Sequence, residues 1–534
     1  MRWSRLGWIL ALLLFAAPTF AQLAPPAIPP GTALQKCQSA LGYVVFISLA
    51  FLIGRICGHR KTIRLRTLFW GAALEFLFAI IVIRPPTMVQ VVEIIIGIFS
   101  IWVVVAYIIR RTTQTRLPGS DLPLLLGAGA LFLLLRLPNV LDILTEGIKA
   151  LLGFAQNGAE IVFGNLTTSN IPVGTATGPM GDFHAMAGHY AFANSYFAFF
   201  ILPTIIFFSC LTTTLYYIGI VQYMVQGLAW IMSKTMGTSG AETLCAVINI
   251  FVGQTEAPLM VKPFLAAATN SELMAMMVAG FGNIASGVLA LYTLWLAPFI
   301  PDAAGHLAAA CFISAPSSLL IAKMLFPELS KPETAAGVKF KIDRLDANLV
   351  DAATRGTLEG LTLALNVAAM LITFTGLVAL VDVLLTTAVG YNPLAHYLNV
   401  HHHMHLILLP VPTLEQLFGY IFRPLAWLTG VSWHESGRVG TLLGIKTVLN
   451  ELIAYSNMKT ALAANAHFLS PRARLLALYS LCGFANFASV GIQVGGIATM
   501  APTRRSDLSR IGLLAMLGGA ISSLTAACIV GVLV

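Results

Sequence analysis

The chain has 534 residues, of which 57% are hydrophobic and only 10% are charged, and its mean hydropathy is +0.84. Soluble domains carry about 25% charged residues, so this composition excludes a soluble enzyme or binding domain and indicates a polytopic membrane protein. A net charge of +9 would suggest nucleic-acid binding in a soluble protein. Here the basic residues lie in short loops, where they orient membrane spans, so we expect no nucleic-acid partner. Seven cysteines show no metal-ligand spacing and are interpreted as small core residues.

The N-terminus has the pattern of a secretory signal peptide at residues 1–21. Arg2 and Arg5 precede a short apolar run, and small residues lead to Gln22. The alternative is a first membrane helix that is retained, but the apolar run is short and a proline-rich stretch follows it. Cleavage would place the mature N-terminus outside the cytoplasm and would indicate a bacterial inner-membrane protein.

Residues 22–137 contain four apolar stretches, and basic loops alternate with them. The loop after the first stretch holds Arg55, Arg60 and Lys61, which the positive-inside rule places in the cytoplasm. The last two stretches, at residues 91–137, are interpreted as an inserted pair of spans. An even number of added spans leaves the topology downstream unchanged.

Residues 138–195 are predicted to form an interfacial helix followed by a polar, glycine-rich external segment. Leu141, Leu144 and Ile148 share one face of a helix at Val140–Leu152, and acidic and basic residues occupy another face. A helix of this kind is too short and too charged to span the bilayer, so we expect it to lie in the membrane interface.

Residues 196–326 begin with a span at Phe197–Ile218 and contain the polar stretch Asn249-Ile-Phe-Val-Gly-Gln-Thr-Glu-Ala-Pro258. Gly253 and Pro258 prevent one continuous helix. Backbone groups freed at membrane depth persist only where protein or a wet cavity satisfies them. Two further spans are predicted at Glu272–Leu296 and Leu307–Leu325.

Residues 327–390 are predicted to form a cytoplasmic loop with an interfacial helix, followed by an outward span at Gly360–Thr386. Residues 391–534 hold an external loop, a second broken stretch at Gly444–Tyr455 and the spans Leu475–Met500 and Ile511–Val534, which leave the C-terminus outside. The external loop carries His401–His405. Adjacent histidines in a solvated loop lack fixed geometry, so we expect no metal site there.

Two broken stretches in corresponding halves of the chain each carry an intramembrane glutamate, Glu256 and Glu451. Such carboxylates are costly at membrane depth unless they are used, and paired broken helices point to a transport site between them. The predicted fold is therefore an all-α polytopic membrane protein. It would have about ten transmembrane helices, two re-entrant helical hairpins in inverted repeats, and interfacial amphipathic helices.

Several long motifs around these breaks resemble the concentrative nucleoside transporter family. They include Lys234-Thr-Met-Gly-Thr-Ser-Gly-Ala-Glu242, Gly253-Gln-Thr-Glu-Ala-Pro-Leu259, Lys446-Thr-Val-Leu-Asn-Glu-Leu-Ile-Ala-Tyr455 and Cys482-Gly-Phe-Ala-Asn-Phe-Ala-Ser-Val-Gly491. The resemblance covers nearly all of residues 197–534. It implies a cation-coupled nucleoside symporter rather than an enzyme.

The resemblance also implies a binding site for the two parts of a nucleoside. The first hairpin would contact the nucleobase, the second hairpin and a later helix would hold the ribose hydroxyls, and a phenylalanine would form an apolar wall. The matching residues are Gln254, Thr255 and Glu256 for the base, Glu451, Asn486 and Ser489 for the ribose, and Phe484 for the wall.

For the coupling cation, the family's sodium ligands match Asn249, Val252 and Ile284. The remaining family ligand is a serine, and this chain has Asn283 in its place. An amide oxygen can ligate a hard cation, but its longer side chain would move or exclude the ion. Sodium is therefore the expected coupling ion and a proton bound at Glu256 or Glu451 is the alternative. No organic cofactor is expected.

The resemblance further implies a homotrimer in the bilayer, with elevator-type alternating access of the two-hairpin unit against a scaffold. Three rival functions are weaker. A channel would need repeated polar rings along an open path, and an intramembrane enzyme would need an acid–base constellation that the spans lack. A proton-coupled carrier of free nucleobases would leave Glu451, Asn486 and Ser489 without ribose hydroxyls to bind. Preference for purines or pyrimidines stays open.

Overall fold

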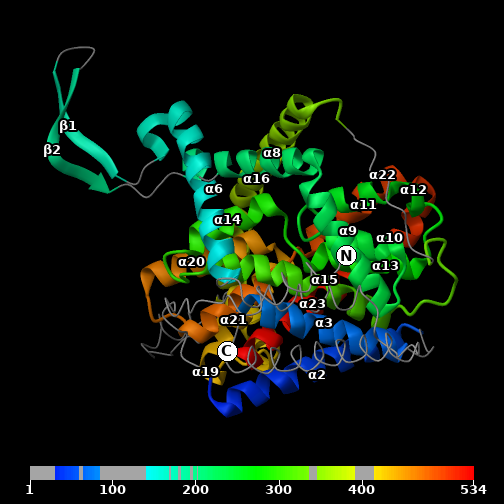
Figure 1. Ribbon diagram of the computed structural model, residues 1–534. Coiled ribbons are helices and arrows are strands. Elements are labelled where there is room, and N and C mark those ends of the chain that lie inside the picture. Colours follow the sequence, from blue (N-terminus) through cyan, green and yellow to red (C-terminus); the bar gives the residue numbers. More distant parts are fainter. Residues whose placement is uncertain are drawn as a thin grey trace, which may run out of the picture. The chain divides into compact units, whose positions relative to one another are not determined.

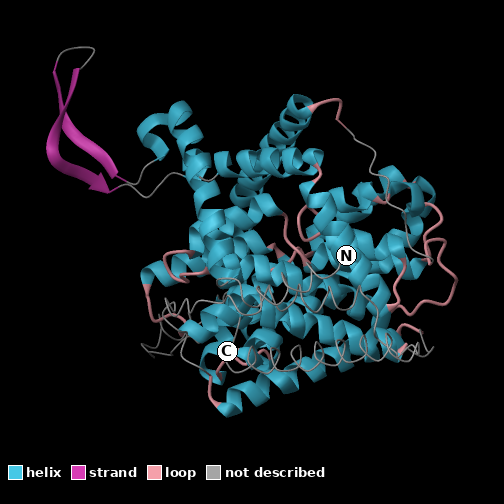
Figure 2. Ribbon diagram, in the orientation of Figure 1, coloured by secondary structure: helices cyan, strands magenta, loops and turns pink. Residues whose placement is uncertain are grey.

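The computed structural model describes residues 31–58, 64–83, 140–167, 170–177, 182–192, 197–200, 202–335, 346–390 and 414–534. Three predictions lie outside these residues: the signal peptide at residues 1–21, the inserted pair of spans at 91–137 and the histidine cluster at His401–His405. The described chain is almost entirely helical (Figure 2), as its composition and periodicity predict.

Two apolar helices begin the described chain: α2 (Ala33–Ile56) and α3 (Leu65–Ile83). α2 starts with a capping box, in which Thr32 and Gln35 satisfy each other's backbone N–H groups. Both helices pack against α15 (Ala303–Leu325) and α23 (Arg505–Leu533) (Figure 1). Within the described residues, five helices are long and apolar enough to cross a membrane, or six if the bent pair α8–α9 is one span.

The predicted interfacial helix is longer than expected. α6 spans Val140–Phe163 instead of ending at Leu152, because the buried residues Leu152, Ala155 and Ala159 continue its apolar stripe. The external segment that follows contains an antiparallel hairpin, which adds two strands outside the helices. The elements here are η1 (Gly164–Thr167), β1 (Asn170–Thr177) and β2 (Asp182–Phe192).

The next helices include a sharply bent pair. After the single turn α7 (Phe197–Phe200), α8 (Leu202–Ile218) and α9 (Ile220–Met236) meet at an angle of 74°. Gly219 lies at the bend with a φ of 100°, a left-handed conformation that side chains beyond glycine rarely adopt.

α8 packs along a single long helix, α16 (Leu349–Gly390). We predicted an interfacial helix in the cytoplasmic loop and a separate span beginning at Gly360. The two regions instead form one helix of 42 residues, which is about 63 Å long at 1.5 Å per residue. α8 lies close to two glycines of this helix: a Cβ at Gly356 would lie 2.7 Å from the Thr213 hydroxyl, and one at Gly360 would lie 2.8 Å from the Ile206 Cα.

The first predicted re-entrant hairpin is present, and we call it hairpin 1. Its first arm is α10 (Gly240–Ile248), capped by Ser239 and Glu242 in a capping box. Residues 249–255 form no regular helix, and the second arm consists of α11 (Glu256–Met260) and α12 (Lys262–Leu265).

The predicted continuous span Glu272–Leu296 is wrong in one respect, because the structure breaks it. α13 (Asn270–Gly282) and α14 (Ser286–Leu296) are separated by three extended residues, 283–285. Ser314 of α15 donates a 2.7 Å hydrogen bond to the Gly282 carbonyl, so a backbone acceptor that the break frees is satisfied by a neighbouring helix.

The second predicted hairpin, called hairpin 2, consists of α19 (Trp433–Val448) and α20 (Glu451–Ala464). α18 (Leu414–Leu428) precedes it and packs along α19. Asn450 caps α20, since its Oδ1 accepts a 2.9 Å hydrogen bond from the Ile453 N–H.

The predicted span Leu475–Met500 is also broken, into α21 (Pro471–Leu481) and α22 (Phe487–Met500). The turn η2 (Pro502–Arg504) then leads to α23. Two arginines on the predicted external side, Arg472 and Arg474, donate to backbone carbonyls of Gly531 at 2.7 Å and Leu469 at 2.8 Å. Arg472 thus binds a carbonyl in the last turn of α23, and Arg474 binds one in the loop that precedes α21.

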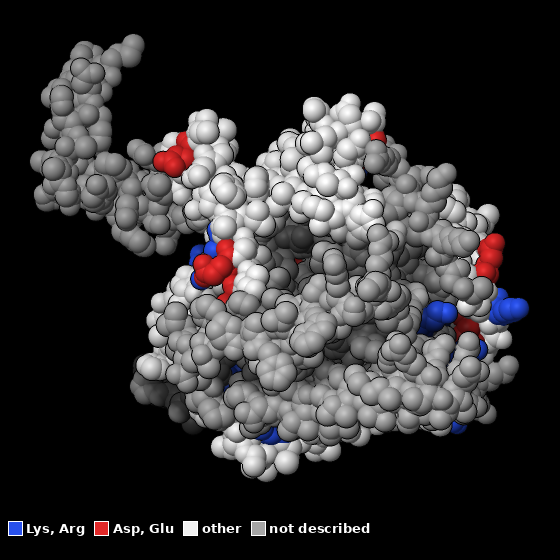
Figure 3. All heavy atoms as spheres, in the orientation of Figure 1, with Lys and Arg blue, Asp and Glu red and all other residues white. Residues whose placement is uncertain are grey.

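In Figure 3 the charged side chains among the described atoms lie mainly toward the edges of the face shown. The interior is formed by the broken helices together with α15 and α23. The most hydrophobic windows of α13–α14 and α15 are each 94% buried, so the two breaks lie in protein and not in lipid.

Candidate functional site

The tip of hairpin 1 is closed by its own glutamate. The Gly253 N–H donates a 2.5 Å hydrogen bond to Oε2 of Glu256, the first residue of α11. A carboxylate here also faces the positive end of that helix turn. A Cβ at position 253 would lie 2.9 Å from the same carboxylate oxygen, so a larger residue there would push the Glu256 side chain aside.

Glu256 is exposed and lines a cavity of about 70 Å³ between hairpin 1, α8, α14 and α16. Val252, Tyr216, Arg355 and Glu359 are among the other lining residues. Pockets that bury drug-sized ligands have volumes of about 300–1,000 Å³, so this cavity is too small for a nucleoside in the conformation described.

Gln254 points into the protein on the other side of the tip. It is buried, and its Oε1 has no hydrogen-bond partner. Gln493 of α22, also buried with an unpartnered Oε1, reaches the same place. A Cβ at Gly280 would clash with Gln493 Nε2 and lie 3.0 Å from Gln254 Cβ. Two buried amide oxygens without donors are unusual, and both could accept hydrogen bonds from a polar ligand.

The tip of hairpin 2 is more fully satisfied. Glu451 is buried, and Tyr292 of α14 donates to its Oε1 at 2.9 Å while Asn486 donates to its Oε2 at 3.2 Å. The ring of Tyr292 stacks on Tyr455 with centroids 4.2 Å apart, which fixes the donating hydroxyl in place. This carboxylate is held by two other elements, so its position is preorganised.

Asn486 reaches Glu451 from a helix cap. It precedes α22 in extended conformation, and its Oδ1 accepts a 2.8 Å hydrogen bond from the Ser489 N–H. The cap therefore links Asn486, which also donates to Glu451, to the first turn of α22, where Ser489 lies.

The two broken helices cross at their breaks. The Phe484 N–H, between α21 and α22, donates to the Asn283 carbonyl, between α13 and α14, at 3.3 Å. Gly483 permits this approach: its φ is 131°, and a Cβ would lie 2.7 Å from the Phe281 carbonyl oxygen. The chain segments of Phe484 and of Asn283 are therefore adjacent.

Asn283 is buried at this crossing, and both atoms of its amide lack hydrogen-bond partners. A free amide oxygen of this kind fits a hard cation or a polar ligand. The neighbouring predicted ligand Ile284 is buried, while Val252 lines the same cavity as Ala285. The Asn249 amide nitrogen donates to the Cys245 carbonyl at 3.2 Å.

The predicted site residues thus form two neighbourhoods. Glu451, Asn486, Ser489, Phe484 and Asn283 are linked directly or through the crossing. The cavity that Glu256 and Val252 line does not include Glu451, Phe484, Asn486 or Ser489. Thr255 lies against α22, since a Cβ at Gly496 would be 3.0 Å from its methyl group.

Three residues of these neighbourhoods were missed: Tyr292, Arg355 and Gln493. Gln493 stands four residues after Ser489 on one helix face, a spacing that could have identified it. Tyr292 and Arg355 carried no such signal, because their contacts with residues far along the chain arise only in the folded protein.

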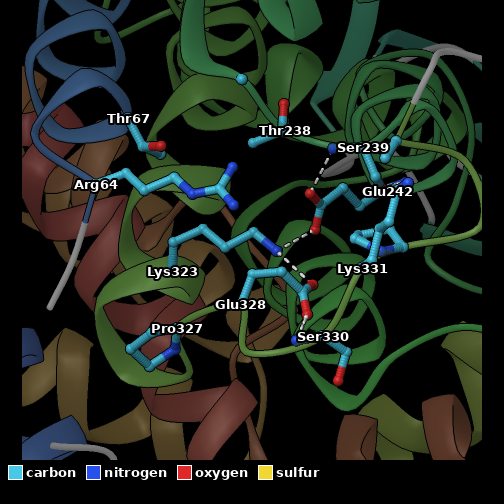
Figure 4. Close-up of a pocket in the computed structure, with 13 residues that line it drawn as sticks. Arg64, Thr67, Thr238, Ser239, Glu242, Lys323, Pro327, Glu328, Ser330 and Lys331 are labelled. Carbon is cyan, nitrogen blue, oxygen red and sulfur yellow. Dashed lines mark hydrogen bonds and ion pairs between the residues drawn. The ribbon is translucent and has the colours of Figure 1, made fainter. Parts of the chain in front are cut away.

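A separate polar cavity, of about 260 Å³, lies at the base of hairpin 1 (Figure 4). Lys323 at its wall pairs with Glu242 at 2.6 Å and lies 3.6 Å from Glu328. It also donates to the Ser271 hydroxyl at 2.8 Å. This network ties the first arm of hairpin 1 to α13 and α15, so we interpret it as structural.

Among the residues that the structure describes, no group of three or more His, Cys, Asp or Glu side chains could hold a metal ion. What the interior offers instead is carboxylates, amides and freed backbone groups at the meeting point of two hairpins and two broken helices. Such an arrangement defines a membrane carrier, in which polar groups at helix breaks bind solute and ion.

Comparisons with known proteins agree with this class. Sequence profiles described as Na+ dependent nucleoside transporter N-terminus, nucleoside recognition (Gate) and Na+ dependent nucleoside transporter C-terminus match residues 41–107, 198–299 and 306–531. An uncharacterized transporter of Bacillus subtilis, YutK, is 37% identical over 389 residues, covering 72% of this chain and 85% of that protein. Sodium/nucleoside cotransporter 2 of Rattus norvegicus is 31% identical over 512 residues, which are 93% of this chain and 63% of that protein.

Solved structures of the transporter CNTnw are similar over nearly their whole length. Its inward-facing, substrate-bound state is 30% identical with a TM-score of 0.68, covering 93% of this chain and 98% of that chain. An outward-facing state of a CNTnw variant gives a TM-score of 0.69 at 30% identity over 93% of this chain and 97% of that chain. The chain belongs to the Na+-dependent, or concentrative, nucleoside transporter family. It is an integral membrane transporter and not an enzyme.

Proposed function

We propose that this chain imports nucleosides across the bacterial inner membrane by symport with a cation. The observation that carries the proposal is the crossing of the two broken helices. It places the unpaired Asn283 amide beside the segment that presents Phe484 and Asn486, and Asn486 in turn holds Glu451. In the proposed mechanism this crossing joins an ion site at Asn283 to a ribose site at Glu451.

In this mechanism each tip has its own task. Glu451, Asn486 and Ser489 bind the ribose hydroxyls, because a carboxylate with fixed oxygens accepts hydrogen bonds from two adjacent hydroxyls. Gln254, Thr255 and Glu256 bind the base edge, and Phe484 covers its apolar face. Gln493, as a second buried amide next to Gln254, completes the base-reading side.

Sodium is the proposed coupling ion, with Asn249, Asn283 and the carbonyls of Val252 and Ile284 as its ligands. Oxygen donors of this kind suit a hard cation. Bound sodium would hold the breaks closed around the ligand and so couple its own gradient to uptake. Within a proposed homotrimer, the two-hairpin unit would move as an elevator against α8 and α16. The similarity to a protein solved in both inward- and outward-facing states supports such alternation.

A calorimetric titration tests the substrate class. Purified protein in sodium should bind uridine or adenosine but bind uracil at least about tenfold more weakly, because the free base makes no contact with Glu451. Equal affinity for uridine and uracil would instead favour the second candidate, a proton-coupled carrier of nucleobases.

A further inference from the structure

Glu75 is a carboxyl that the transport mechanism above does not use. It lies at the middle of α3 and is 0% exposed, and neither of its oxygens has a hydrogen-bond partner. A carboxylate buried in the membrane without a counter-charge is costly by several kcal/mol. The other buried glutamates described above each have donors or a lysine, so Glu75 stands apart.

The groups around Glu75 are hydroxyls and a thiol. The hydroxyls of Tyr43 on α2 and Ser317 on α15 face it, but the Tyr43 hydroxyl is itself unpartnered and Ser317 is engaged with Thr525 of α23 at 2.9 Å. From α23, the Cys528 thiol lies near Tyr43. α6 and α9 also pack against α3, and among the described residues no Lys, Arg or His from any of these helices pairs with Glu75.

The packing leaves no room for a larger ligand. One turn before Glu75, a Cβ at Gly71 would lie 3.0 Å from Leu320 of α15. At the next residue after Glu75, the Phe76 ring meets the Tyr43 ring at 5.5 Å between centroids. A sodium ion needs several oxygen ligands, and among the side chains that the structure describes only the Tyr43 and Ser317 hydroxyls face Glu75. A proton needs none beyond the carboxyl itself.

We propose that Glu75 is a proton-binding site, and that α3 packs against α2 and α15 only while this carboxyl is neutral. Loss of the proton places an unpaired charge in the contact between the three helices. The ionised form therefore requires water to enter or α3 to move, and the exchange of solute becomes pH-dependent. The measurement of uridine exchange rests on the proposed transport function, whereas the measurement of unfolding does not.

The test uses the full chain in two measurements, with Glu75→Gln and a matched control, Glu160→Gln, at an exposed position of α6. The first measurement is the midpoint of thermal unfolding in detergent between about pH 5.5 and about pH 8.5. The second is uridine equilibrium exchange in proteoliposomes over the same range, where no ion gradient drives flux.

The wild type and E160Q should lose stability as the pH rises, and their exchange should fall about tenfold per pH unit above the midpoint of the titration. E75Q should keep its unfolding midpoint across this pH range, and its rate of uridine exchange should change less than about twofold. Glutamine imitates the neutral carboxyl and does not titrate. Identical pH profiles for E75Q and the wild type would overturn the proposal.

A second variant covers the case in which E75Q does not fold. Tyr43→Phe removes the one free hydroxyl that could support the ionised carboxylate, so the midpoint of the wild-type pH profile should move to higher pH. An unmoved midpoint would contradict the proton site. If the wild type exchanges no uridine, the proposed function fails, and the unfolding profiles still decide the role of Glu75.

Discussion

The tips of the two hairpins carry the same chemical group in opposite settings. Glu451 at hairpin 2 is buried, and each oxygen accepts a hydrogen bond from a side chain of another element. Glu256 at hairpin 1 is exposed to a cavity, and its one hydrogen bond comes from the backbone of its own loop. The comparison indicates that two other elements hold the Glu451 carboxylate in place, while the Glu256 carboxylate is held by its own loop and faces a cavity.

The largest expected effect is at the rigid tip. Glu451→Gln replaces one carboxylate oxygen with an NH₂ group, which would face the donor of Tyr292 or of Asn486. Two buried donors that face each other cost about 2–3 kcal/mol. Uridine affinity should fall at least about 30-fold, measured by titration. Glu435→Gln, on the first arm of the same hairpin, is the control and should bind nearly normally. Near-normal binding by E451Q would remove the ribose assignment.

At the open tip the same change should matter less. Glu256→Gln loses a charge-assisted hydrogen bond to Gly253 and a contact with the base, which predicts about a tenfold loss of uridine affinity. Glu359→Gln alters a carboxylate that lines the same cavity and serves as its control. A greater loss in E256Q than in E451Q would reverse the comparison between the tips.

The crossing of the breaks offers a third test, which concerns the ion. Asn283→Ser replaces an unpartnered amide with a shorter hydroxyl side chain. The sodium concentration for half-maximal uptake should shift about three- to tenfold, and the uridine concentration for half-maximal uptake should shift less. The measurement is uptake against sodium concentration. If both wild type and variant ignore sodium, Asn283 is no sodium ligand.

The smallest effect concerns Asp346, which precedes α16. The Arg355 guanidinium holds the pKa of Asp346 below its usual range through hydrogen bonds of 2.7 and 2.9 Å. The stability that this ion pair adds is fully present above the ordinary pKa of aspartate, about 4. It is lost as the pH falls through the lowered pKa of Asp346. Asp346→Asn should therefore lower stability at pH 7 by about 1 kcal/mol or less and converge with wild type in acid, as thermal unfolding would show. An equal difference in stability between D346N and the wild type at pH 7 and in acid would contradict the ion pair.

Sequence and structure agree where the signal is local. Around Gly253 and Pro258, and again at Glu451, polar residues interrupt apolar stretches, and this local pattern predicts both hairpins. The breaks at Asn283 and between α21 and α22 were placed inside continuous spans. Their backbone groups are satisfied by Ser314 and by each other, and such contacts between distant segments leave no pattern in the local sequence.

The candidate site divides in the same way. Gln254, Glu256, Glu451 and Asn486 could be chosen because each is a polar residue in an apolar stretch that resembles a family motif. Tyr292 could not, because a tyrosine in a span is ordinary until its hydroxyl is seen to meet Glu451. Local chemistry thus predicts the polar residues of the site, and tertiary contact decides which of them are held in place.

The most direct test of the account is uptake of radiolabelled uridine into proteoliposomes under an imposed sodium gradient, with an imposed proton gradient in parallel. We predict that the sodium gradient drives accumulation and that E451Q abolishes it. Accumulation driven by protons alone would move the coupling site from Asn283 to a buried carboxyl. Failure of uridine, adenosine and a free base to accumulate under either gradient would contradict nucleoside import.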